Sequence, residues 1–90
     1  MKDHWESEAA GILKSLLARD DVGYKKLALE LAKLGVQETE RALRNKINRG
    51  SFSFPFFLSC LVALGYEDVR FTVRPAKPTS GASRVTPRIV

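Results

Sequence analysis

The chain has 90 residues, of which 44% are hydrophobic and 28% are charged. This length provides one modest core, which supports a single domain of roughly three to five helices and excludes two independent domains. Fifteen Lys and Arg residues against ten Asp and Glu residues give a net charge of +5 and a pI near 9.7. Such a basic balance favours an anionic partner such as nucleic acid.

The cysteine content and the hydropathy pattern restrict the compartment in which the protein works. Cys60 is the single cysteine, so no internal disulfide can form, and the chain fits a reducing cytoplasm. Its neighbours are Phe, Leu and Val, which favours a buried, inert thiol. No stretch approaches ~20 consecutive apolar residues, and residues 1–10 are too acidic and too polar for a secretory signal. We therefore expect a cytoplasmic protein without a membrane partner.

Two amphipathic helices are predicted in the first third of the chain. From Trp5 the apolar residues recur at the spacing of one helical face, which predicts a helix over about 5–19. A turn rich in Asp and Gly follows, and the next apolar face predicts a helix over about 24–34. Lys25 and Lys26 lie on the outer side at the start of this helix, where they are placed to contact phosphate. The alternative is that both are simply solvated.

A third helix, predicted over about 37–48, carries the strongest functional signal. Gly35 ends the preceding helix, because glycine readily adopts the left-handed conformation at a helix terminus. Glu40, three residues after Gln37, is expected to complete a capping box at the start of the third helix. The apolar stripe consists of Val36, Leu43 and Ile47, and the opposite face of Glu38, Arg41, Asn45, Asn48 and Arg49. Arginine and asparagine can each bind a base through paired hydrogen bonds, whereas a plainly solvated face, the alternative, usually mixes Lys and Glu.

The rest of the chain predicts one more helix, a strand and a tail. Residues 54–64 are apolar on nearly every side, so this helix either lies centrally or is covered by a second subunit. Alternating apolar residues predict a β-strand over about 69–74. A lone strand needs a partner, so we expect it to pair with its symmetry mate in a homodimer; the alternative is an extended segment laid against the helices. Residues 75–90 contain no acid and predict a flexible basic tail.

The order of these elements resembles the helix-turn-helix of the lambda-repressor-like superfamily. The resemblance rests on Leu27-Ala28, on Gly35-Val36 at the turn, and on residues 42–48 before an apolar fourth helix. More narrowly, residues 5–65 resemble a small bacterial family filed as a domain of unknown function. The narrower match rests on Trp5, Gly23-Tyr24, Glu38-Thr39-Glu40, Arg44-Asn45-Lys46-Ile47, Arg49-Gly50, Phe52-Ser53 and Phe56-Phe57-Leu58. The resemblance implies that the third helix enters the major groove of DNA while the second bridges the backbone.

We therefore predict an all-α, compact four-helix lambda-repressor-like helix-turn-helix domain over residues 1–74, with the short C-terminal strand, and a flexible tail over residues 75–90. The expected function is sequence-preferring binding of double-stranded DNA, as a small bacterial transcriptional regulator or nucleoid-associated factor. The resemblance assigns base contacts to Gln37, Glu38, Arg41 and Asn45. We assign phosphate contacts to Lys25, Lys26, Arg44, Asn48 and Arg49, tail contacts to Lys77, Arg84 and Arg88, and dimer contacts to Phe56, Val69, Phe71 and Val73.

Other classes of function have less support in the sequence. No catalytic constellation, metal-ligand spacing or glycine-rich phosphate loop is found, so we expect neither an enzyme nor a cofactor or metal site. The main alternative is a protein-interaction module that grips a partner with the Phe-rich helix over 54–64 and the strand. It is motivated by more phenylalanine than a small core needs. RNA binding would require solvent-facing aromatic residues on a sheet, of which the chain offers few.

Overall fold

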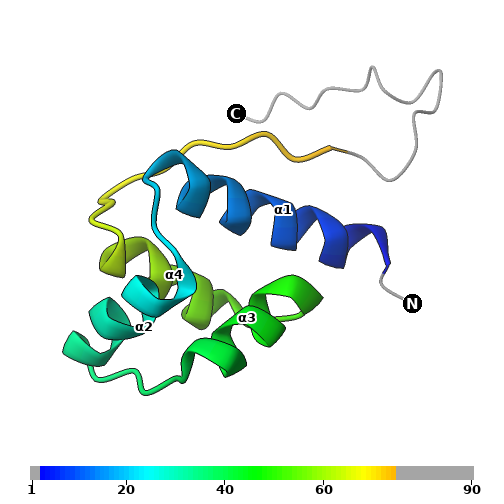
Figure 1. Ribbon diagram of the computed structural model, residues 1–90. Helices are drawn as coiled ribbons and strands as arrows, with labels where there is room; N and C mark the ends of the chain where they lie inside the picture. Colours follow the sequence, from blue (N-terminus) through cyan, green and yellow to red (C-terminus); the bar gives the residue numbers. More distant parts are fainter. Residues whose placement is uncertain (1–2, 75–90) are drawn as a thin grey trace, which may run out of the picture.

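The computed structural model describes residues 3–74, which form four α-helices and no β-strand (Figure 1). The helices are α1 (His4–Arg19), α2 (Tyr24–Lys33), α3 (Glu40–Arg49) and α4 (Phe54–Ala63). The predicted all-α fold with four helices is confirmed for this part of the chain. In the view of Figure 1, α1 lies across the top and the three shorter helices lie beneath it.

Side-chain caps determine where the helices begin. At the start of α1, Asp3 Oδ1 accepts a hydrogen bond from the Glu6 main-chain N–H at 2.8 Å, and Glu6 Oε1 accepts one from the Asp3 N–H at 3.3 Å. This reciprocal capping box satisfies two N–H groups that the helix leaves unpaired. At the start of α4, Ser53 Oγ accepts a hydrogen bond from the Phe56 N–H at 3.1 Å, and serine is among the residues that cap helices best.

The third helix begins three residues later than predicted. Thr39 is its N-cap, with Oγ1 accepting a hydrogen bond from the Ala42 N–H at 3.0 Å. The predicted capping box between Gln37 and Glu40 is therefore wrong, because threonine caps a helix far better than glutamine and the chain uses the better cap. Gln37 and Glu38 consequently lie in irregular chain before α3 and not on its surface.

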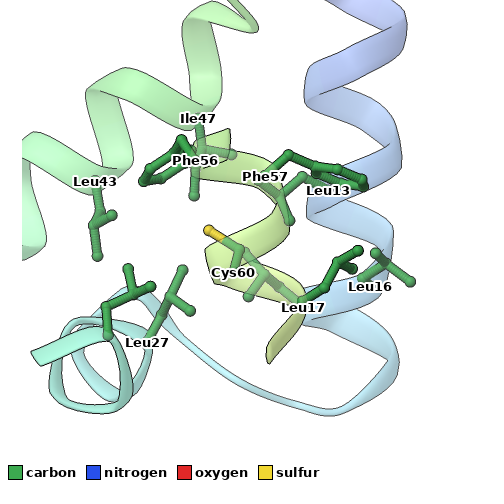
Figure 2. Close-up of a cluster of buried hydrophobic side chains, with 11 residues drawn as sticks. Leu13, Leu16, Leu17, Leu27, Leu43, Ile47, Phe56, Phe57 and Cys60 are labelled. Atoms are coloured by element: carbon green, nitrogen blue, oxygen red, sulfur yellow. The ribbon is translucent and has the colours of Figure 1, made fainter. Parts of the chain in front are cut away.

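One hydrophobic core joins all four helices (Figure 2). Its buried members are Leu13, Leu16 and Leu17 of α1, Leu27 and Leu31 of α2, Leu43 and Ile47 of α3, and Phe56, Phe57, Cys60 and Leu61 of α4. Within each helix these positions lie one, three or four residues apart, which places them on one side of the helix. α3 packs against both α1 and α2, and α4 packs against α2. The inward stripe of α3 is thereby held from two sides, and this fixes which of its faces points to solvent.

Gly50 holds the C-terminal end of α3 against α1. Its φ of 74° is left-handed, and its N–H donates to the carbonyl oxygens of Ile47 and Lys46, which ends the helix. A Cβ at Gly50 would overlap the main-chain carbonyl group of Glu6 in α1. Glycine is therefore required here for its conformation and also for its size. Gly35, which ends α2, has a similar φ of 87°, but a Cβ there would meet open space.

Residues 69–74 form no β-strand, so that prediction is wrong. A strand is defined by hydrogen bonds to a neighbouring strand, and the part of the chain that the structure describes offers none. The segment lies along α1 instead, as the alternative proposed (Figure 1). Glu8 accepts hydrogen bonds from the main-chain N–H and the Nε of Arg74 at 3.1 and 3.3 Å, and His4 Nε2 donates to the Arg74 carbonyl oxygen at 2.8 Å. The predicted tail contacts, Lys77, Arg84 and Arg88, lie outside the described residues.

Candidate nucleic-acid interface

The solvent-facing side of α3 carries a row of exposed polar side chains. Arg41, Asn45 and Arg49 follow one another at four-residue spacing, and all three are exposed. Within residues 3–74, none of the three forms a hydrogen bond or an ion pair. We call these residues the outer face of α3. Since Leu43 and Ile47 anchor the opposite side in the core, the outer face cannot turn inward without breaking that packing.

Arg44 flanks the outer face and connects α3 to α2. Its Nη2 lies 3.3 Å from Glu40 Oε2, one turn earlier, and its guanidinium carbon lies 5.3 Å from the centre of the Tyr24 ring at the start of α2. Both partners in the ion pair are about half exposed, so the pair adds little stability. Arg44 is thus positioned by weak contacts that an anion could replace.

The two lysines at the start of α2 lie on different sides of that helix. Tyr24 marks the side that faces α3, and about 100° per residue places Lys25 roughly 100° from it and Lys26 roughly 160° from it. Lys26 instead lines a shallow hollow with Val62 and Leu64 at the end of α4. Both lysines are exposed, and Lys25 lies nearer than Lys26 to the side of α2 that faces α3.

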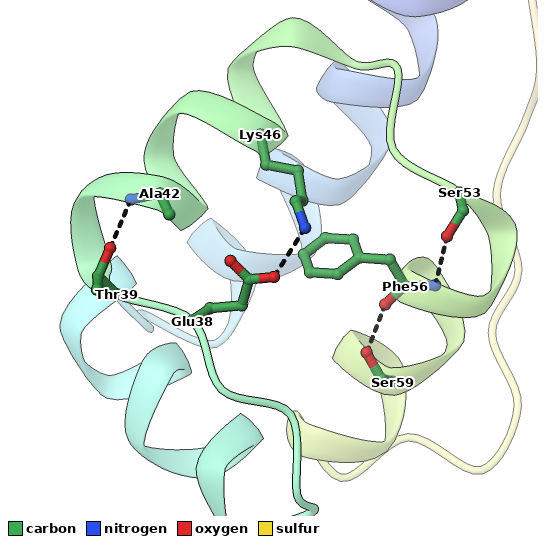
Figure 3. A network of polar contacts seen from close by, with 7 residues as sticks. All are labelled: Glu38, Thr39, Ala42, Lys46, Ser53, Phe56 and Ser59. Atoms are coloured by element: carbon green, nitrogen blue, oxygen red, sulfur yellow. Dashed lines mark hydrogen bonds and ion pairs between the residues drawn. The ribbon is translucent and has the colours of Figure 1, made fainter.

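Glu38 and Lys46 form an ion pair that faces inward (Figure 3). Lys46 Nζ donates to Glu38 Oε2 at 2.7 Å and lies 4.7 Å from the centre of the Phe56 ring. The Glu38 side chain is only 18% exposed. The residue assigned to a base contact is therefore bound to its own chain. Phe56, which we assigned to a dimer contact, is buried in the core beneath Lys46 and is not available to a second copy.

A groove extends the outer face toward α4. It has a volume of about 500 Å³ and is bounded by Asn45, Lys46 and Arg49 on α3 and by Ser51 and Ser53 in the turn before α4. Asn48 lies on the same helix, partly buried and engaged in a contact of its own.

The supporting roles of Thr39, Lys46 and Tyr24 were not predicted. A threonine ahead of a polar helix was the one local signal that could have identified Thr39.

The single thiol of the chain lies in the core of the domain. Cys60 is buried as predicted, and this burial raises the pKa of its thiol to about 12. Residues 3–74 contain no group of His, Cys, Asp and Glu placed to hold a metal ion. In the same residues, every helix is too short or too polar to cross a lipid bilayer.

Comparison with known proteins identifies the family. No curated protein and no solved structure matches the chain. One family model, described as "Domain of unknown function (DUF6471)", matches residues 5–69. This match begins in the first turn of α1, includes all of α2, α3 and α4, and ends at Val69. It confirms the narrower of the two resemblances found in the sequence. The chain belongs to this family of domains of unknown function, DUF6471.

Proposed function

We propose that the protein binds double-stranded DNA with a sequence preference, as a small transcriptional regulator or nucleoid-associated factor. The binding unit is a helix-turn-helix made of α2, residues 34–39 and α3. The observation that carries this proposal is the outer face of α3, where Arg41, Asn45 and Arg49 are exposed and unpaired within residues 3–74. Such side chains can exchange water for the polar groups of a ligand without breaking a hydrogen bond or an ion pair in the described residues.

Arg41 and Asn45 are the residues proposed to contact bases. They are one turn apart on the same face, and an α-helix fits the major groove of B-form DNA. The guanidinium group of arginine matches the two acceptors of guanine, and the amide of asparagine matches the donor and acceptor of adenine. Gln37, exposed just before α3, is the third candidate. Glu38 takes a supporting role, because its carboxylate is bound to Lys46.

Lys25, Arg44 and Arg49 are proposed to contact phosphate. Lys25 and Arg44 lie where α2 meets α3, and Arg49 lies at the other end of the outer face, so the three would bracket the base-contacting residues. Cations at phosphates release counterions and strengthen binding at low salt. We leave Lys26 out of this set because it lies on the other side of α2. The roles of Asn48 and of the tail residues Lys77, Arg84 and Arg88 stay predictions.

The net charge of the helical domain is much smaller than that of the whole chain. Residues 3–74 hold all ten acidic residues and all but four of the fifteen basic ones, so this part carries a charge of only +1. The other four are Lys2, Lys77, Arg84 and Arg88. Net charge alone would hardly draw the helical domain to DNA, so its contribution must come from the local concentration of cations on α3.

The test begins with selection of bound sites from random duplexes, followed by affinity measurements on the selected site and on a scrambled one at two salt concentrations. Arg41→Ala and Asn45→Ala should each reduce the discrimination between the two duplexes by about 1–3 kcal/mol. Lys25→Ala should weaken binding equally on both and reduce the salt slope by about 1.

Lys26→Ala is the matched control, since it removes the neighbouring lysine from the other side of α2. It should leave both the preference and the salt slope unchanged. A protein that binds no duplex at low salt would contradict the proposal as a whole. A preference that survives both Arg41→Ala and Asn45→Ala would contradict the assignment of the outer face to base contacts.

A further inference from the structure

A second surface of the domain has no role in DNA binding as proposed. It centres on an apolar hollow of about 250 Å³ between α1, the start of α4 and residues 69–74. The hollow is lined by Ala9, Ile12, Phe52, Phe54, Phe57 and Phe71. Ser53 also borders it, but its hydroxyl group already caps α4. The lining therefore offers no free polar group to recognise a polar ligand, and the group that fills it should be apolar.

Trp5 projects beside this hollow. It lies one turn before Ala9 on the same side of α1, and it is 55% exposed. The ring of His4 lies edge-on to the indole with centres 4.7 Å apart, which restricts its movement. Phe54 and Phe71, at the rim of the hollow, are 66% and 47% exposed. One surface thus presents both a projecting aromatic side chain and an apolar space of suitable size.

We propose that two copies of the chain associate through this surface, with Trp5 of each copy filling the hollow of the other. A two-fold interface uses the same surface on both subunits, so that surface must supply both complementary parts. With a helical rise of about 1.5 Å per residue, Trp5 lies roughly 6–10 Å along α1 from the part of the helix that lines the hollow. A two-fold axis that passes between Trp5 and the hollow would place Trp5 of each copy at the hollow of the other. The α1 helices of the two copies would then run antiparallel.

The volume of the hollow suits an indole ring. A dry cavity of about 150 Å³ lined by Leu, Ile and Phe is enough to bind benzene, so the larger hollow here accommodates a bicyclic ring. Its aromatic walls are already arranged for ring contacts, since Phe71 meets Phe57 edge-on with centres 6.1 Å apart. Aromatic pairs of this kind stabilise an interface beyond the effect of the area that they bury.

The exposed area and the charges are compatible with a small dimer interface. A fully covered aromatic side chain buries roughly 150–250 Å², so Trp5, Phe54 and Phe71 from both copies, each about half exposed, supply about half of the ~1,200 Å² found in the smallest stable interfaces. Glu8 lies near the proposed axis, but its carboxylate is bound by Arg74. Two copies can therefore approach without bringing two uncompensated carboxylates together.

This surface is separate from the proposed DNA interface. None of the residues proposed to contact DNA lines the hollow. Self-association can therefore be measured without DNA, and its failure would leave the proposed function untouched. Likewise, a protein that dimerises but ignores every duplex would contradict the proposed function alone.

Trp5 is the only tryptophan of the chain, so its fluorescence reports directly on this contact. The experiment is sedimentation velocity together with tryptophan emission from about 0.1 µM to about 500 µM protein, which covers dissociation free energies from about 4.5 to about 9.5 kcal/mol. We expect a monomer–dimer equilibrium in which the emission shifts to shorter wavelength as the dimer forms. Trp5→Ala and Ala9→Arg should each weaken the dimer by at least about 100-fold, because two central contacts are lost per dimer.

Leu29→Ala is the matched control, since it removes an exposed apolar side chain of α2 that lies outside the hollow. It should leave the equilibrium unchanged. Trp5 is largely exposed, so Trp5→Ala leaves the core intact, and circular dichroism verifies the helix content of each variant. A chain that stays monomeric throughout, or a dimer that survives Trp5→Ala, would overturn the proposal. So would emission typical of a buried indole at the lowest concentration, because the hollow's occupant would then belong to the same chain.

Discussion

The two ends of α3 are attached to the domain in different ways. At the C-terminal end, the backbone of Gly50 lies directly against the backbone of Glu6 in α1. At the N-terminal end, Gly35 stands in open space, and side chains supply the attachment through the Thr39 cap and the ion pair of Glu38 with Lys46. One end is therefore fixed by shape and the other by polar contacts. A helix held in this way can be re-aimed most readily from its N-terminal end, which is the end nearer Gln37 and Arg41.

The largest effect should come from Gly50→Ala. Alanine in the left-handed conformation costs about 1–2 kcal/mol, and the overlap with Glu6 should bring the total loss to at least about 3 kcal/mol. Gly35→Ala is the control, because it has the same backbone requirement without the overlap, and it should cost only about 1 kcal/mol. Urea unfolding followed by circular dichroism measures both. If the two variants lose the same free energy of unfolding, α1 moves aside at the contact between Gly50 and Glu6. Close packing would then not fix the C-terminal end of α3.

An intermediate effect is expected at the N-terminal end. Because Glu38 is largely buried and Lys46 also contacts Phe56, Glu38→Gln and Lys46→Met should each destabilise the fold, with a coupling energy of about 1 kcal/mol in a double-mutant cycle. The half-exposed pair of Glu40 with Arg44 on the same helix provides the comparison, and its coupling should stay below about 0.5 kcal/mol. If the two cycles give the same coupling energy, burial does not strengthen the inward pair.

The smallest effect concerns the attachment of residues 69–74 to α1, which is polar and lies at the surface. Hydrogen bonds from Arg74 lower the pKa of Glu8 from its usual 4.5. The bond from the main-chain N–H of Arg74 has the largest effect. A carboxyl group with a lowered pKa stabilises the folded state above its unfolded pKa and loses that contribution as the pH falls through the folded value. The advantage of the wild type over Glu8→Gln should therefore be present at neutral pH and disappear in acid.

Thermal unfolding from about pH 7 down to about pH 3 would measure this difference. Glu67→Gln serves as the control, because Glu67 is exposed and makes no ion pair within residues 3–74. Its difference from the wild type should not depend on pH. A wild type that is no more stable than Glu8→Gln at neutral pH would mean that the segment is held by packing of Phe71 and not by the carboxylate.

The helices were predictable from the sequence, and the errors have identifiable physical causes. Apolar spacing located α1, α2 and α4 to within one residue at each end. The start of α3 was misplaced because apolar spacing does not show which polar residue will cap a helix. Alternation over 69–74 was taken for a strand, but the same pattern suits a segment that packs Val69 on the core and Phe71 on Phe57 without a partner strand.

The candidate site was predictable only where one helix determines it. The exposure of Arg41 and Asn45 follows from their place opposite Leu43 on a helical wheel. Glu38 lies before the helix, where the wheel does not apply, so its inward position could not be anticipated. The contact of Lys46 with Phe56 depends on how α4 packs under α3, and no spacing in the sequence encodes that arrangement.

The enclosure of Cys60 has a consequence for the chemical durability of the protein. Its sulfur lies at the centre of the core and stays protonated across the physiological pH range. Oxidants and alkylating agents react with the exposed thiolate, so they reach this sulfur only in molecules whose helices have already separated. Chemical damage at the single cysteine would therefore follow the loss of structure and would not cause it.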